Sequence, residues 1–453
     1  PAPSWAMPYL SSGQRVDKLL PDSPDDAFAA YEFNEMPPLV DDDRTNVNFG
    51  GAISLLSYEV SAAAAGTELP VTLIWQVANP PADNYLPFLQ LEDNWGHRWS
   101  QEESFAYPAE QWDAGETIVQ HVRMPVPQGT PPGTYRLRIG MFDPDTGQRL
   151  PRLDDEGRYA GDAYFVEPVT INIGELADEI PEPPFNVDDL VLPGLRLVGY
   201  ERGEATVETG APWGLSLWWL ATEPLPNMAS HFELVEQGGH SWTIATSQPV
   251  HNTYPFTEWE IPQFVIDRQQ LTIPIDLPAG DYRLRLQITD LEGEIIYTTD
   301  MGPLAVEETD HLFSAPPVEE PLEATFGNEI ALLGYDLSMD EDSTIGLILV
   351  WQALEGPAAD YTIFVHVLDQ DGTCCIWQQD GMPRQNQYPT SRWLAGEVVE
   401  DPYEIILPDN LVPGEYAIEV GLYIAETGQR LLVELPGEVE TDRVLLRPLQ
   451  VTE

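Results

Sequence analysis

One six-residue frame recurs three times in this chain of 453 residues. It consists of Tyr-Pro, three variable positions and Trp, and it occupies residues 107–112, 254–259 and 388–393. Proline has no backbone N–H to give to a sheet, so each tyrosine is expected in a turn or at the end of a strand. A frame repeated at wide intervals predicts several copies of one structural module.

Other segments repeat in the same order around this frame. Apolar and polar residues alternate with the period of a strand at 71–77, 215–221 and 347–353. Later in each copy a Gly-x-Tyr turn starts a strand and hairpin, at 131–150, 278–297 and 412–431. Short strands separated by turn signals, without helical periodicity, predict an all-β protein of three tandem antiparallel β-sandwich domains. Their type is left open between immunoglobulin-like and jelly-roll.

Acidic, proline-rich stretches mark the expected boundaries. These are an N-terminal arm at 1–47, sandwich repeats at 48–173, 185–306 and 322–453, and linkers at 174–184 and 307–321. Proline makes the linkers semi-stiff, so the three sandwiches are expected to form a rod or a gentle arc. The aromatic residues of the arm predict that it packs on its own first domain or adds a strand to a neighbouring subunit.

The charge of the chain limits its partners. There are 76 acidic and 20 basic residues, which gives a formal net charge of −56. Nucleic acid is excluded because its binding depends on basic groups that displace counterions. An anionic membrane surface is disfavoured for the same reason, and no apolar run is long enough to span a bilayer. The chain begins at Pro1 without a signal peptide, so we interpret it as a mature or excised segment.

Lysine and cysteine are almost absent. Lys18 is the only lysine, which excludes Lys–Asn isopeptide crosslinks inside the repeats. Cys374 and Cys375 are adjacent and are the only cysteines, so no disulfide framework exists. The pair forms either a vicinal disulfide or two thiols, and we interpret it as incidental small hydrophobic residues.

The motifs of the third copy resemble a known domain. Residues 351–431 carry WQA, DYTIFVHVLDQDG, YPTSRW, GEVVEDPY, PGEY and VGLYIAETGQRL in this order. This series is similar to the extracytoplasmic C-terminal β-sandwich domain of Chloroflexi-type membrane glycosyltransferases of the dolichyl-phosphate-mannose class, and to related secreted surface proteins. The resemblance covers the first copy less well and only the skeleton of the second. It implies an envelope-exposed accessory domain and supplies no catalytic residues.

No catalytic or metal-binding motif stands out. The seven histidines form no metal-ligand frame, and His366 in the strand FVHVL is interpreted as a structural residue. There is no nucleophile elbow or phosphate-binding loop, and no cofactor is predicted. Acidic turns give a weak calcium hypothesis, because calcium prefers carboxylate oxygens. The candidate ligands are Asp143, Asp145, Asp154, Asp155, Asp369 and Asp371.

Tryptophans offer a second weak hypothesis. Those that recur in equivalent positions are expected in the cores, because packing explains a repeated aromatic residue best. They are Trp99, Trp242 and Trp377, and Trp112, Trp259 and Trp393. Trp95 has no counterpart in the other copies and is the one candidate for stacking on a glycan.

These observations predict a non-enzymatic, extracellular or cell-surface structural protein. It would be a building block of a surface layer, filament or adhesive assembly, with partners that are further copies or other envelope proteins. The alternative is a glycan-binding accessory region of a cell-envelope glycosyltransferase or hydrolase.

Overall fold

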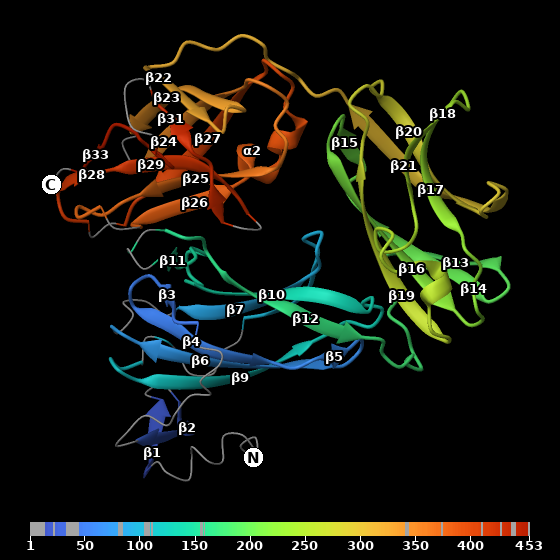
Figure 1. Ribbon diagram of the computed structural model, residues 1–453, viewed down its shortest axis with the longest axis horizontal. Helices are drawn as coiled ribbons and strands as arrows, with labels where there is room; N and C mark the ends of the chain where they lie inside the picture. Colours follow the sequence, from blue (N-terminus) through green and yellow to red (C-terminus); the bar gives the residue numbers. More distant parts are fainter. Residues whose placement is uncertain are drawn as a thin grey trace.

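The computed structural model describes most of the chain and consists almost entirely of β-strands (Figure 1). The described residues are 14–20, 23–32, 45–79, 85–103, 109, 112–154, 157, 159–339, 344–372, 375–408, 411–425, 428–435 and 441–451. Within them the only segment with α-type hydrogen bonding is the four-residue α2 (Pro383–Asn386), whose residues 384–386 have left-handed backbone. No helix in these ranges is long and apolar enough to cross a membrane. The predicted all-β sandwich class is confirmed.

The strands after the arm form three pairs of sheets. In the first sheet pair one sheet has the order β11-β3-β4-β6-β9 and the other β5-β12-β10-β7-β8. The bounds in the first sheet are β3 (Val47–Phe49), β4 (Ile53–Val60), β6 (Glu68–Val77), β9 (Thr117–Pro125) and β11 (Arg152–Leu153). Those in the second are β5 (Ala63–Ala64), β7 (Leu86–Glu92), β8 (Arg98–Glu102), β10 (Gly133–Phe142) and β12 (Tyr164–Asn172).

The second sheet pair has the orders β13-β14-β16-β19 and β15-β21-β20-β17-β18. The bounds in its first sheet are β13 (Phe185–Leu192), β14 (Leu195–Arg202), β16 (Pro212–Ala221) and β19 (Gln263–Thr272). Those in its second sheet are β15 (Thr206–Glu208), β17 (Ala229–Glu236), β18 (Ser241–Ser247), β20 (Gly280–Thr289) and β21 (Ile295–Glu307).

The third sheet pair has the orders β27-β24-β23-β22-β31 and β26-β25-β29-β30, and β32 also pairs with β29. The bounds in its first sheet are β22 (Glu320–Phe326), β23 (Ile330–Met339), β24 (Thr344–Ala353), β27 (Val398–Ile406) and β31 (Val433–Glu434). Those in its second are β25 (Tyr361–Val367), β26 (Trp377–Gly381), β29 (Ile418–Ile424), β30 (Gln429–Arg430) and β32 (Val444–Leu445). A small ribbon joins β28 (Gly414–Tyr416) to β33 (Leu449–Val451).

The three pairs share one order over four strands of each sheet, and each pair has its own core around a tryptophan. In each pair the central tryptophan is fully buried. Its register partner lies on the neighbouring strand β9, β19 or β27, called the fourth strand below, and is β-branched. These pairs are Trp75 with Ile118, Trp219 with Val265, and Trp351 with Val399. The sheets are not purely antiparallel, because the short edge strands β5 and β15 pair in parallel with the last strand of their sheets.

The N-terminal arm contains the hairpin of β1 (Gln14–Leu20) and β2 (Ser23–Glu32), which forms a two-stranded sheet of its own. Much of the predicted arm lies outside the described residues. Val47, the last residue predicted for the arm, is buried in β3 and belongs to the first sheet pair.

The predicted rod or gentle arc is wrong, because the third sheet pair folds back onto the first (Figure 1). Both linkers lie against the sheet pairs, which fixes the bends. Leu176 and Ile180 of the first linker pack on the first core. In the second linker Thr309 is buried, and its hydroxyl donates to the carbonyl of Thr209 at 2.8 Å. Linker composition predicts stiffness but not the direction of a bend.

The junction between the first and second sheet pairs depends on Gly129 in the turn after β9. Its carbonyl accepts a hydrogen bond from the amide of Ile266 at 2.8 Å. A Cβ at this position would meet Ile266 and Phe264 at 2.7 Å. Glycine is therefore required here by contact as well as by its φ of +80°.

We expect Gly129→Ala to open this junction, because it combines a positive φ with a steric clash. Gly115→Ala is the matched control, since Gly115 has a φ of +82° but nothing within 4 Å of its Cβ position. Both variants lose about 1 kcal/mol from backbone strain, and only Gly129→Ala should enlarge the radius of gyration in small-angle scattering. Equal radii for the two variants would contradict the predicted clash.

Two left-handed turns precede the Tyr-Pro frame in the second and third sheet pairs. Three consecutive residues have positive φ in each turn, 250–252 and 384–386. Left-handed backbone costs about 1–2 kcal/mol per non-glycine residue, so each turn needs compensating bonds. The amide of Val250 donates to Asp267 Oδ1 at 2.7 Å, and that of Arg384 donates to Asp401 Oδ1 at 2.6 Å. Both aspartates are buried on the fourth strand of their sheet.

Candidate functional site: a polar junction between the first and third sheet pairs

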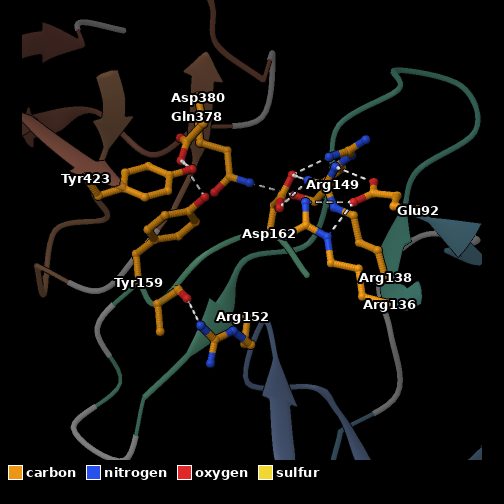
Figure 2. Close-up of polar contacts among 11 residues, drawn as sticks. Glu92, Arg136, Arg138, Arg149, Arg152, Tyr159, Asp162, Gln378, Asp380 and Tyr423 are labelled. Atoms are coloured by element: carbon orange, nitrogen blue, oxygen red, sulfur yellow. Dashed lines mark hydrogen bonds and ion pairs between the residues drawn. The ribbon is translucent and has the colours of Figure 1, made fainter. Parts of the chain in front are cut away.

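Polar side chains of the first and third sheet pairs meet in a buried junction (Figure 2). Tyr159 and Asp162 lie between β11 and β12, and Arg138 comes from β10. On the other side Asp380 comes from β26 and Tyr423 from β29. The junction therefore joins distant parts of the chain, because Tyr159 and Asp380 are 221 positions apart in the sequence.

His366 lies on the third-pair side of this junction and is held between two carboxylates. Its Nδ1 is 2.9 Å from Glu419 Oε1, and its Nε2 is 2.9 Å from Asp380 Oδ1. Burial alone would lower the pKa of His366, but the charge of Asp380 and the hydrogen bonds to both carboxylates outweigh it and raise the pKa. The imidazole is fully buried. It therefore favours the doubly protonated form, which donates to both carboxylates.

Tyr159 covers this histidine from the first sheet pair. The two rings are 4.2 Å apart at an angle of 61°. The hydroxyl of Tyr159 donates to Asp380 Oδ2 at 2.6 Å, and that of Tyr423 donates to the same oxygen at 2.9 Å. Burial raises the pKa of Tyr159 well above its usual value, so the hydroxyl keeps the proton that it donates. One carboxylate thus links the two sheet pairs.

Asp162 holds the arginines of the first sheet pair in place. Nη2 of Arg138 lies 2.7 Å and 2.9 Å from the two carboxylate oxygens, and Arg149 also pairs with Asp162. Burial alone would raise the pKa of Asp162, but the two guanidinium groups outweigh it and lower the pKa. Gln378 donates to the carbonyl of Arg149 at 2.8 Å across the junction. Figure 2 shows this second bridge beside the tyrosine pair.

A pocket of about 350 Å³ opens beside the junction. It is lined by Arg152, Asp154, Tyr159, Ala160, Gly428, Arg430, Leu432 and Asp442. Nη2 of Arg430 donates to the carbonyl of Tyr159 at 3.2 Å, and Arg152 donates to the carbonyl of Ala160. The arginines therefore bind backbone carbonyls of the first sheet pair.

A second polar junction joins the second and third sheet pairs through Arg392 of the YPTSRW frame. Its Nη2 donates to the carbonyl of Thr209 at 2.7 Å and to the hydroxyl of Thr309 at 3.1 Å. The same atom lies 3.3 Å from Glu208 Oε2. The frame thus provides a core corner through Tyr388 and Trp393, both 2% exposed, and a contact between sheet pairs through its arginine.

The chemistry open to the first junction is limited by its geometry. Both ring nitrogens of His366 already bind carboxylates, and no part of the side chain is exposed. A general base needs a free nitrogen within reach of a substrate proton. The arrangement suits a buried ionic clamp, in which opposite charges and hydrogen bonds compensate the cost of burial.

The calcium candidates lie mostly in acidic turns, where they bind backbone amides. Asp143 Oδ1 accepts from the amide of Asp145 at 2.9 Å, and Asp369 Oδ1 accepts from the amide of Asp371 at 3.0 Å. Asp154 lines the pocket, and Asp155 lies outside the described residues. No group of three or more His, Cys, Asp and Glu residues suited to a metal occurs among the residues that the structure describes.

The recurrent tryptophans lie in the cores as predicted. Trp99, Trp112, Trp259, Trp377 and Trp393 are all buried, and Trp242 is half-buried against the second core.

Trp95 instead lies between the first two sheet pairs. It stacks on His251 of the second pair with ring centroids 4.6 Å apart and packs against the second core cluster. This half-buried ring therefore has one face covered by the second sheet pair.

The two cysteines are only partly described. Cys375 is disulfide-bonded, and Cys374 lies outside the described residues. The disulfide alternative therefore replaces our interpretation of the pair as incidental small hydrophobic residues.

No protein-family model matches the chain, and no curated protein is detectably similar to it.

Proposed function

We propose that the chain is a non-catalytic, extracellular structural protein, the building block of a surface layer, filament or adhesive assembly. The supporting observation is the use of its polar side chains. His366, Asp380, Tyr159 and Arg392 all bind groups that hold one sheet pair against another. Such contacts give the subunit a defined shape, which an ordered assembly requires.

The arm is the second element of this proposal. Among the described residues its hairpin of β1 and β2 pairs with no other strand, and an isolated two-stranded hairpin is marginally stable in water. Packing on a larger sheet, in its own or a neighbouring subunit, would stabilise it. The acidic surface is consistent with a protein that stays soluble until it is assembled, because like charges repel.

Electron microscopy of the native surface material tests this proposal. We expect the chain to repeat in an ordered lattice or fibre. Deletion of residues 1–44, which leaves Thr45 and its hydrogen bond to Leu55 in place, should reduce the order of material reassembled from purified protein. Native material without any ordered repeat of this chain would contradict the proposal, as would binding to a glycan array that is lost in Trp95→Ala.

A further inference from the structure

In each sheet pair, the sheet that carries the central tryptophan has an outer face that points away from the core. The residues that cover this face differ between the three pairs. On this face the residue before the central tryptophan pairs with a residue of the fourth strand. The three pairs are Ile74 with Val119, Trp218 with Ile266, and Val350 with Glu400. These positions point away from the core, because they alternate with the buried tryptophan along the strand.

In the second sheet pair this face is covered by the preceding sheet pair. Trp218, Phe264 and Ile266 are 9%, 7% and 7% exposed and belong to the first core cluster. They pack around the turn that follows β9, where Gly129 accepts the bond from Ile266. The contact is thus made between the end of one sheet pair and the face of the next.

In the third sheet pair the same face is only partly covered, because Glu400, the equivalent of Val119, is exposed. Val350 and Val398 are each 1% exposed, and Val398 forms a bridge with Leu312 of the second linker. The preceding sheet pair therefore covers this face in the second sheet pair, and the preceding linker covers part of it in the third.

The face of the first sheet pair is more open. Val119 is 46% exposed, although its equivalent Ile266 is 7% exposed, and Ile74 is half-buried where Trp218 is buried. Because the same face of the second sheet pair is an interface, Val119 and Ile74 are the apolar residues at which a further contact is expected.

The third sheet pair has an end that corresponds to the end of the first sheet pair that contacts the second. The segments after β9, β19 and β27 correspond in chain order, because each leads to the Gly-x-Tyr strand, and residues 407–408 and 411–413 of the third segment are described. In the third sheet pair this region exposes Ile406 at 63% and Val412 at 65%. The chain thus presents an uncovered end at its last sheet pair and an open face at its first.

We propose that a second copy of this chain occupies the open face. The end of its third sheet pair, with Ile406 and Val412, docks on Val119 and Ile74, repeating between subunits the end-to-face contact made within the chain. This surface rests on the proposed assembly function and specifies its geometry. A head-to-tail contact between unlike surfaces gives an open filament or a closed ring. The net charge of −56 opposes it, so association strengthens as salt screens the repulsion.

Sedimentation of the full chain over a concentration series, at about 0.15 M and about 1 M NaCl, tests the contact. Wild-type protein should form oligomers that grow with concentration and with salt. Val119→Glu and Val412→Glu should each weaken association roughly tenfold or more, because each places a charge in an apolar contact. Leu291→Glu, at a position 77% exposed in the second sheet pair, is the matched control and should associate like wild type.

Mixing the two variants tests the polarity of the contact. Val119→Glu keeps an intact end and Val412→Glu an intact face, so an equimolar mixture should form dimers and stop there. Oligomers that survive both substitutions would overturn the inference while leaving the assembly function in place. Wild-type protein that stays monomeric throughout would overturn it too, and the assembly function then fails only if native material also lacks an ordered repeat.

Discussion

Replacing His366 by leucine is expected to lower the free energy of unfolding of the third sheet pair by about 3–5 kcal/mol. The imidazolium is the shared partner of Asp380 and Glu419, which are 2.9 Å from its two nitrogens. Without it Glu419 still pairs with Arg443, but among the described residues Asp380 keeps the hydroxyls of Tyr159 and Tyr423 and no cation. A buried carboxylate that loses its cationic partner carries a large desolvation cost.

Denaturant titration combined with hydrogen exchange of the β25, β26 and β29 amides measures this loss. The exchange data assign the effect to the third sheet pair, because a chain with several cores need not unfold in two states. His240→Leu is the control, since His240 is exposed. If both leucine variants are equally stable, the clamp contributes nothing to stability.

The same variant has a defined pH dependence. The pKa of His366 is raised in the folded protein, so its contribution is fully present below its unfolded pKa and is lost as pH rises through the folded value. The pKa of Glu419 is lowered because its bonds to His366 and the nearby arginines outweigh burial. Its contribution is lost only as pH falls through that lowered value. The difference between wild type and His366→Leu should therefore shrink on the alkaline side.

The cores were predictable because their signals are local. Alternation over seven residues predicts that Trp75, Trp219 and Trp351 face the core. The recurrence of Tyr-Pro-x-x-x-Trp predicts that the tryptophan of this frame is also buried, and both kinds of tryptophan are. These features depend on strand period and turn chemistry, which a sequence displays directly. The domain boundaries drawn from linker composition stay predictions.

The junctions were not predictable, because they depend on how the linkers orient the sheet pairs. Nothing near Tyr159 in sequence indicates Asp380, which lies 221 positions away. A partial signal was present in two strands. His366 and Glu419 stand within otherwise apolar runs, TIFVHV and IEVGL, and a charged group in a buried strand requires a partner. Pairing the two would have indicated a buried ion pair, but not that the first sheet pair covers it.

The second large effect is expected to be stabilising and to come from the left-handed turns. Desolvation raises the pKa of Asp267 from 3.8 to about 6, and the same cause raises that of Asp401 to about 6. Both carboxyls thus favour the neutral form more in the folded than in the unfolded chain. Asn keeps an oxygen for the turn amide and has no charge to bury, and its amide nitrogen takes the buried position of Oδ2, which offsets part of the gain. We expect Asp267→Asn to stabilise the protein by about 1–3 kcal/mol at pH 7–8.

The pH dependence identifies the mechanism. For an acid whose folded pKa is raised, stability is highest below the unfolded value near 3.8 and is lost as pH rises through about 6. Wild-type protein should therefore gain stability between about pH 7 and about pH 5, and Asp267→Asn should gain less over the same range. Asp281→Asn in β20 is the control, because Asp281 is exposed. Thermal unfolding across this pH range measures all three proteins.

A destabilising effect of Asp267→Asn would show that the left-handed turn needs the ionised carboxylate. Asp267 Oδ1 accepts from the amide of Val250 and from Gln269 Nε2, and a weaker hydrogen bond from the Trp219 side chain also lowers the pKa of the carboxyl without outweighing burial. If the ionised form were needed to hold three left-handed residues, Asp267→Asn would be less stable than wild type at pH 8 and equal to it at pH 5. A neutral carboxyl has the geometry to satisfy both donors through Oδ1 alone. The cost of burying the charge then outweighs the gain from a charge-assisted bond, and the asparagine variant is the more stable protein at neutral pH.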